Sequence, residues 1–205
     1  FTLVEEDSAA ILETVEESKA YSQLHPGAVY LHQGEPFLIT ELDLESKTAY
    51  AQRTEVPYYT EVRTLTETRV LNVYKKKRAG TVDIYLGEVS VTTTVVGFSR
   101  RASTTSEVLG HEYVKLPPQS YDTTALWFDV PRDALARIRA DHRDLAGGLH
   151  AMEHAAIGLL PLFALCDRRD IGGISTPLHP DTGRPQVFIH DGHPGGVGIA
   201  EHGYE

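Results

Sequence analysis

The sequence predicts an α+β protein, in which a small antiparallel β barrel or sandwich is followed by an α-rich module with a short strand pair. Through most of residues 28–131, apolar and polar side chains alternate as they do in a half-solvated antiparallel sheet. Turn residues interrupt this alternation at short intervals, which is typical of small barrels and sandwiches. After Pro131 the spacing becomes helical, with Leu135 and Ile138 on one face.

The composition is that of an ordinary globular protein. The chain has 205 residues, 41% hydrophobic and 23% charged, enough for a sizeable core in one domain or two small ones. A formal net charge of -10 argues against a surface that binds nucleic acid everywhere and leaves room only for a local basic patch. The single cysteine excludes an internal disulfide and suits a reducing compartment. Because no stretch can span a bilayer and no signal peptide is evident, we expect a cytoplasmic protein without a membrane partner.

Residues 1–27 are predicted to form a β hairpin and a helix that link to an upstream part of a longer protein. We expect that upstream part because the chain begins with Phe1 rather than Met. β-Branched and apolar residues flank the predicted turn at Asp7-Ser8. One acidic helix through Glu13–Glu17 is the alternative to the hairpin. The following helix is expected over residues 16–24.

Residues 28–131 are predicted to form an antiparallel β module. Three short strands come first, and the alternation over Tyr58–Tyr74 predicts another strand. Lys75–Arg78 is expected to form a basic turn. Leu109–Lys115 and Ala125–Val130 are expected to pair with each other around a proline turn.

Residues 132–205 are predicted to form the α-rich module. The apolar run Ala155–Leu165 predicts a helix buried on most of its circumference. A charge cluster, Asp167–Asp170, follows it directly. Two strand-like pieces and the glycine-rich loop Asp191–Gly198 then lead to another helix start.

The first candidate site is His150-Ala151-Met152-Glu153-His154, an H-x-x-E-H pattern. On a helix, His150 and His154 lie one turn apart on the same face with Glu153 beside them, which is an arrangement that can hold zinc. A third ligand is needed, and no second motif surrounds the acidic residues that follow. Two histidines one turn apart are also common on a polar helix face.

The second candidate is Cys166. A lone cysteine at the end of an apolar helix is usually a small buried hydrophobe. A catalytic thiol needs a lowered pKa, to which Arg168 and Arg169 could contribute. A metal site would need companions from the histidines that follow, which have no ligand spacing of their own: His179, His190 and His193.

The glycine-rich loop Asp191–Gly198 is a third candidate. Its backbone N–H groups could face an anion, because it joins a strand to a helix. No Gly-Lys-Ser/Thr follows, so it does not match a phosphate loop. A tight turn that needs small residues explains the glycines equally well.

Basic and aromatic residues of the β module are candidates for contact with nucleic acid. Phosphate contacts are expected from Lys75, Lys76, Lys77, Arg78, Arg100 and Arg101. Tyr58, Tyr59 and Trp127 are candidates for base stacking, with core packing as the alternative for Trp127.

The block GGLHAMEHAAIGLLPLFALCDRRDIGGISTPLHPDTGRPQVFIHDGHPGGVGIAE resembles the C-terminal zinc-binding domain of MrfA/YprA-type helicases. The stretches HPGAVYLHQGEPFLI and YDTTALWFDVP resemble the region of the same family that follows the motor. The resemblance implies that Cys166 is the first of four zinc cysteines, with the other three beyond residue 205, so that the zinc-binding domain in 132–205 is truncated. It also implies an upstream motor that binds ATP and magnesium, and no nucleotide-binding motif occurs here.

The resemblance implies no catalytic role for the H-x-x-E-H residues. We expect them to form a buried polar network with the charge cluster, in which desolvated charges must be paired. Its members would be His150, Glu153, His154, Asp167, Arg168, Arg169 and Asp170.

The function that we expect is therefore an accessory C-terminal region of an ATP-dependent 3′–5′ DNA helicase acting in DNA repair at the bacterial nucleoid. The region itself would not be an enzyme, and would brace the motor and contact single-stranded or partly duplex DNA. Zinc would complete the fold in the full-length protein. The alternatives are a zinc-dependent hydrolase that uses the H-x-x-E-H helix, and a protein-interaction module without DNA affinity.

Overall fold

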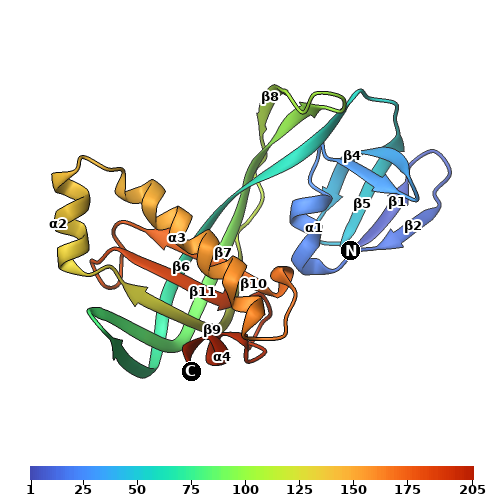
Figure 1. Cartoon of the computed structure of the whole chain (residues 1–205). Coiled ribbons are helices and arrows are strands. Elements are labelled where there is room, and N and C mark those ends of the chain that lie inside the picture. The colour runs from blue at the N-terminus through green and yellow to red at the C-terminus, as the bar shows by residue number, and fades with distance from the viewer. The chain divides into compact units, whose positions relative to one another are not determined.

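A computed structural model describes all 205 residues and confirms the α+β class (Figure 1). The chain forms two compact units, and each is discontinuous in sequence. The first contains Phe1–Leu65 and Thr93–Gln119, and the second contains Thr66–Thr92 and Ser120–Glu205. These units divide the chain differently from the expected boundaries after residues 27 and 131. The reason is that two long strands run through both units.

The long strands are β6 (Tyr58–Ala79) and β7 (Val82–Ala102), joined by a tight turn at Gly80. The expected basic turn at Lys75–Arg78 is therefore wrong, because these residues belong to β6. The turn begins only after Ala79. Gly87 marks the close approach of the two strands, because a Cβ there would lie 2.0 Å from the carbonyl oxygen of Asn72.

The first unit contains a five-stranded sheet with the order β2-β1-β5-β4-β3. Its strands and the accompanying helix are β1 (Thr2–Glu5), β2 (Ile11–Thr14), α1 (Glu17–Gln23), β3 (Val29–His32), β4 (Glu35–Asp43) and β5 (Thr48–Arg53). Neighbouring strands run antiparallel except for β1 and β5, which pair in parallel. Side chains such as Leu3, Phe37 and Ile39 fill the core beneath it, each at most 2% exposed.

The expected pairing of Leu109–Lys115 with Ala125–Val130 is wrong. In the first unit, β8 (Val108–Tyr113) pairs with β7. In the second unit, β9 (Gln119–Asp129) pairs with β7 and β11 instead. Pro117-Pro118 lies in a link between β8 and β9 that forms no turn, and proline disfavours a helical residue before it.

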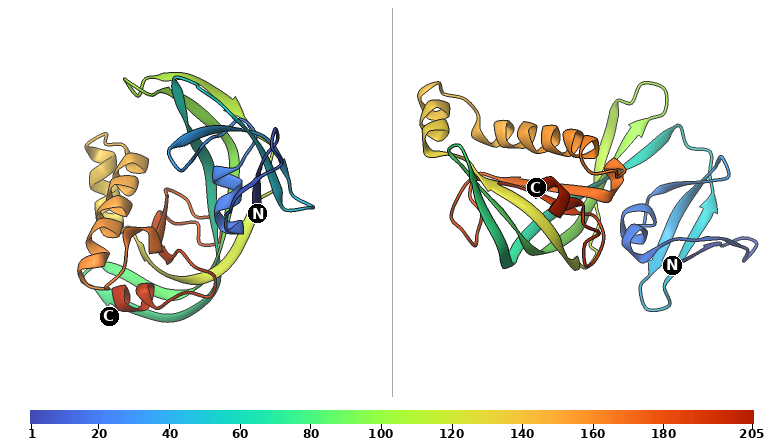
Figure 2. Two further views of the ribbon diagram at one scale, coloured as in Figure 1. Left: turned by 90° about the vertical axis from the view of Figure 1, so that its right-hand side faces the viewer. Right: turned by 60° about the horizontal axis from the view of Figure 1, so that its bottom comes forward.

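The second unit contains a curled sheet with the order β10-β11-β9-β7-β6 (Figure 2). Its short strand pair is β10 (Ile171–Thr176) and β11 (Gln186–Asp191). Phe188 on β11 lies opposite Trp127 on β9, and their rings stack with centroids 5.4 Å apart. Trp127 is 1% exposed, so this stack belongs to the core of the sheet.

The helices of the second unit are α2 (Arg132–Ala140), α3 (Leu145–Leu159), the 3₁₀ turns η1 (Leu160–Leu162) and η2 (Arg168–Asp170), and α4 (Ile199–Tyr204). Helix α3 packs against β10 and β11, and α4 packs against β11. Helix α3 begins at the N-cap Asp144, whose side chain accepts the backbone N–H of Ala146 at 3.0 Å. None of these helices combines the length and the apolar composition that a membrane span requires.

The apolar run Ala155–Leu165 is not buried on most of its circumference, contrary to expectation. Only one stripe of α3 faces the sheet, and it consists of Leu149, Glu153 and Ile157. After the helix, Leu162 and Phe163 are each 76% exposed and Leu165 is fully exposed. The sheet covers only one side of the segment, and the apolar side chains on its other side face solvent.

Candidate functional site

The two histidines of the H-x-x-E-H pattern contact each other on the exposed face of α3. The Nε2 atoms of His150 and His154 are 3.1 Å apart, and their rings meet edge to face. Glu153 points the other way, into the fold, where its carboxylate accepts the hydroxyl of Ser175 on β10 at 2.6 Å. The Nδ1 atom of His150 lies 3.4 Å from the same carboxylate.

These contacts form a row of polar side chains along α3. A guanidinium nitrogen of Arg168 lies 3.5 Å from Nδ1 of His154, and a guanidinium can only donate, so this ring nitrogen is placed to accept. The two imidazoles lie between the exposed Arg168 and the buried Glu153 carboxylate.

The remaining members of the expected network lie elsewhere. Asp167 and Asp170 form a capping box around η2. The Asp167 carboxylate accepts the backbone N–H of Arg169, and the Asp170 carboxylate accepts the backbone N–H of Asp167, each at 2.9 Å. Asp170 also lies 3.3 Å from Nε2 of His193, which together with a backbone N–H lowers the pKa of its carboxyl. Arg169 is exposed and has no side-chain partner. Glu153 is the only buried member of the expected network, which differs from the continuous buried cluster that was predicted.

Cys166 is a half-buried thiol beside η2. Burial raises its pKa, and the negative charges of Asp170 and Asp167 add to that effect. The expected lowering by the neighbouring arginines is therefore reversed, which does not favour a reactive thiolate. No group of three or more potential ligands surrounds it, so residues 1–205 do not supply a closed zinc site by themselves.

Two of the histidines proposed as companions of Cys166 belong to the interior of the second unit. His179 lies between the carbonyl oxygen of Thr68 at 3.1 Å and the N–H of Asp181 at 3.3 Å. His190 is 5% exposed and lies 3.0 Å from the carbonyl oxygen of Asp191. Burial lowers the pKa of both rings, which keeps them neutral.

The glycine-rich loop holds an anion of the protein itself. The fully buried carboxylate of Asp191 accepts backbone N–H groups from four consecutive residues, Val197, Gly198, Ile199 and Ala200. Gly196 is needed because its φ is +75° and a Cβ would lie 2.6 Å from the hydroxyl of Thr124. The amides that could have bound a ligand are therefore already occupied.

The basic candidates are mostly paired with carboxylates or carbonyls. Lys76 lies 3.1 Å from Asp83, and Lys77 contacts the carbonyl oxygen of Tyr204 and covers its ring. The other pairs lie in the first unit: Arg100 with Glu112 at 3.0 Å, and Arg101 with Glu61 at 2.5 Å. Lys75 is exposed and makes no such contact. Arg78 uses only its Nε atom, which donates to the carbonyl oxygen of Gly80 at 3.3 Å.

The aromatic candidates differ in their exposure. Tyr59 is 38% exposed. Tyr58 lies beneath the guanidinium group of Arg100, 5.7 Å from its ring centroid. Trp127 lies in the core, which leaves only the tyrosines available to a ligand.

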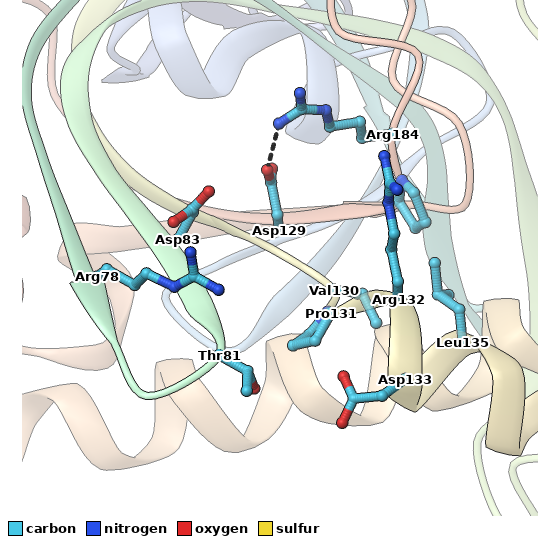
Figure 3. A pocket seen from close by; sticks show the side chains of 11 residues that line it. Arg78, Thr81, Asp83, Asp129, Val130, Pro131, Arg132, Asp133, Leu135 and Arg184 are labelled. Atoms are coloured by element: carbon cyan, nitrogen blue, oxygen red, sulfur yellow. Dashed lines mark hydrogen bonds and ion pairs between the residues drawn. The ribbon is translucent and has the colours of Figure 1, made fainter.

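A cavity of about 610 Å³ in the second unit brings together arginines that the sequence does not connect (Figure 3). Arg78 comes from the end of β6, Arg132 from the first turn of α2, and Arg184 from the segment before β11. Arg184 binds Asp129 at 2.7 Å, as the dashed line in Figure 3 shows. Arg132 and Arg184 were not among the predicted residues, because no local pattern marks them.

Comparison with known proteins identifies the family context. Residues 152–205 match the family model of the MrfA Zn-binding domain. The uncharacterized ATP-dependent helicase YprA of Bacillus subtilis is 29% identical over 192 residues, which cover 93% of this chain and 25% of YprA. The ATP-dependent helicase HRQ1 of Saccharomyces cerevisiae is 28% identical over 155 residues, 75% of this chain and 14% of HRQ1.

Solved structures extend this similarity to the fold. A crystal structure of the DUF1998 helicase MrfA bound to DNA has a TM-score of 0.72 and 27% identity, covering 99% of this chain and 27% of that one. A second, with DNA and AMPPNP, has a TM-score of 0.63 and 26% identity over 98% of this chain and 25% of that chain. The chain thus spans about a quarter of YprA and of the MrfA chains. The chain is therefore similar over nearly its whole length to part of the MrfA-type helicases, and its residues 152–205 match the MrfA Zn-binding domain.

Proposed function

We propose that this chain is a non-catalytic accessory region of an ATP-dependent 3′–5′ DNA helicase that acts in DNA repair, where it braces the motor and contacts single-stranded or partly duplex DNA. The observation that carries the proposal is the similarity of nearly the whole chain to MrfA in a structure that contains DNA. The motor, with its ATP and magnesium, would lie in the remaining three quarters of such a protein.

The exposed apolar segment that follows α3 supports the bracing role. Leu159, Leu162, Phe163 and Leu165 are each at least 55% exposed within seven residues of the chain, and apolar side chains gathered at a surface are typical of interaction sites. A covering surface in the parent protein would bury them, and each buried side chain would contribute about 1.5–3 kcal/mol.

Zinc is part of this proposal for the parent protein only. Cys166 would supply one thiolate, and the other ligands would come from outside residues 1–205. Metal analysis of a full-length parent protein tests this, because Cys166→Ser should remove one equivalent of zinc. His154→Ala serves as the control and should leave the zinc in place.

Zinc that is lost in His154→Ala and kept in Cys166→Ser would instead support the zinc hydrolase. That alternative requires Glu153 to reach a water on a metal held by both histidines, but its carboxylate is bound to Ser175 and faces the sheet. No third ligand joins His150 and His154 on their exposed side.

A salt titration of binding to a fluorescent single-stranded oligonucleotide tests the DNA contact. If Lys and Arg side chains neutralise phosphates, the logarithm of the binding constant should fall with the logarithm of salt by about 0.7 for each contact. Lys75→Gln should weaken binding, whereas Lys76→Gln should have a smaller effect because Lys76 is paired with Asp83. If the protein does not bind at low salt, the DNA contact fails and the interaction-module alternative gains support.

A further inference from the structure

The cavity beside the start of α2 contains more unpaired positive than negative charge. It is bounded by the β6–β7 turn, the end of β9, the first turn of α2 and the segment before β11. We call it the arginine pocket and define it by Arg78, Arg132 and Arg184 (Figure 3). These side chains come from three separate elements, so the fold rather than a local motif brings them together.

The carboxylates that line the arginine pocket are largely neutralised by other groups. Asp129 accepts from Arg184 at 2.7 Å, from Gln186 at 2.6 Å and from the hydroxyl of Tyr85 at 3.2 Å. Asp83 is paired with Lys76 at 3.1 Å. Asp133 is the remaining acid, and it has no ion-pair partner.

The guanidinium groups retain free donors. Arg132 is exposed and makes no hydrogen bond or ion pair. Arg78 donates only through Nε, which leaves its terminal nitrogens unused. Arg184 keeps one terminal nitrogen free, because both of its contacts are made by Nη1. A planar guanidinium with two free N–H groups is suited to bind two oxygens of one phosphate.

The backbone adds donors at the same place. Helix α2 has nine residues, and its N-cap is Pro131, which makes no side-chain cap. The first N–H groups of an α-helix have no acceptor within the helix, so those of Arg132 and Asp133 are available at the positive end of the helix dipole. Both residues line the pocket. The hydroxyl of Thr81 on the opposite wall is a further donor.

We propose that the arginine pocket binds a phosphate group, and that in the parent helicase this phosphate belongs to the backbone of the bound nucleic-acid strand. The identification of the strand as the source rests on the proposed function. The phosphate chemistry rests on the pocket alone, and a nucleotide or free phosphate would present the same oxyanion.

Binding of a fluorescent oligothymidine to this protein, followed by anisotropy across a range of salt concentrations, tests the proposal. Arg132→Gln and Arg78→Gln should each weaken binding by roughly fivefold near 0.1 M salt and reduce the salt slope by about 0.7, as expected for one lost contact on a single strand. Asp133→Asn removes the unpaired acid and should tighten binding. Arg137→Gln is the control, because Arg137 lies on the same helix but does not line the pocket.

A second series measures the affinity for inorganic phosphate and for a nucleoside triphosphate by titration calorimetry. If Arg132→Gln weakens oligothymidine binding more than the control does, the proposal is supported. If it weakens only the binding of free phosphate or triphosphate, the phosphate that the pocket binds does not come from a nucleic-acid strand, and that part of the proposal is wrong. If the wild type binds DNA and both pocket variants keep its affinity and salt slope, the pocket is rejected while the DNA contact stands. If the wild type binds neither DNA nor any phosphate, both proposals fail.

Discussion

The carboxylate of Asp191 accepts the backbone N–H of Ala200 at 2.8 Å, which ties the end of β11 to the first turn of α4. Three further backbone N–H groups converge on the same side chain, which is completely buried. A short helix of six residues is not stable by itself, so this contact fixes where the chain's last segment lies.

Asp191→Asn should therefore lower the free energy of unfolding by about 2–3 kcal/mol, because an amide offers one oxygen where the carboxylate offers two and places N–H groups against N–H groups. Urea unfolding followed by circular dichroism measures the loss. Asp133→Asn is the control, since Asp133 is exposed and has no ion-pair partner, and it should cost at most about 1 kcal/mol through the lost interaction with the helix dipole. Equal midpoints for the two variants would contradict the role given to Asp191.

The sequence predicts the parts of this fold that depend on local patterns. Alternation and turn residues predict the strands of residues 28–54, where Gly34 adopts a φ of +86° at the turn between β3 and β4. Pairing between distant strands is different, because register depends on which faces become buried together. The parallel pair of β1 and β5 and the pairing of β9 with β11 could not be predicted for that reason.

The same distinction applies to the candidate sites. The resemblance of the final block predicted the family, and the spacing of His150 and His154 predicted their contact on one helix face. The sequence does not show that Glu153 faces inward to Ser175, since β10 lies more than ten residues away. Nor does it indicate that Arg132 and Arg184 share a cavity, because their elements meet only in the folded sheet.

Gly173→Ala should destabilise the second unit by about 1–3 kcal/mol through overpacking. Helix α3 lies so close to β10 that a Cβ at this position would be 2.7 Å from Cδ1 of Ile157 and 2.8 Å from Cγ of Glu153. Gly148→Ala is the matched control on α3, where a Cβ meets nothing within 4 Å. That control should be neutral or stabilise the protein by up to about 1 kcal/mol. Thermal unfolding distinguishes the two, and equal melting temperatures would refute the close approach.

Stability should decrease as the pH falls below 6.5. Burial lowers the pKa of His179 from its ordinary value of 6.5, so the unfolded chain binds its proton more readily than the folded protein does. The full contribution is therefore present above pH 6.5 and is lost between that value and the lower folded pKa. Protonation would also break the hydrogen bond that Nδ1 accepts from the N–H of Asp181.

Melting temperatures measured from pH 5 to pH 8 check this. The slope below pH 6.5 should become shallower in His179→Gln, but should not vanish, because burial also lowers the pKa values of His25 and His190. The exposed His142 provides the control, and His142→Gln should leave the slope unchanged. A flat profile in the wild type would show that these rings titrate alike in the folded and unfolded states.

Replacing Leu162 and Phe163 by serine should reduce self-association of the isolated chain without lowering its stability. Each side chain is 76% exposed, so the substitutions remove apolar surface from solvent and leave the core intact. Leu160 in the same turn is 8% exposed, and Leu160→Ser should instead destabilise the fold by several kcal/mol, or about the cost of an emptied core position. Sedimentation velocity measures the self-association, and urea unfolding measures the stability.

In a full-length parent protein the same double substitution should weaken ATP-dependent unwinding, because the covering surface loses its apolar contact. Unchanged unwinding there, together with a monomeric wild-type chain at high concentration, would show that this surface braces nothing.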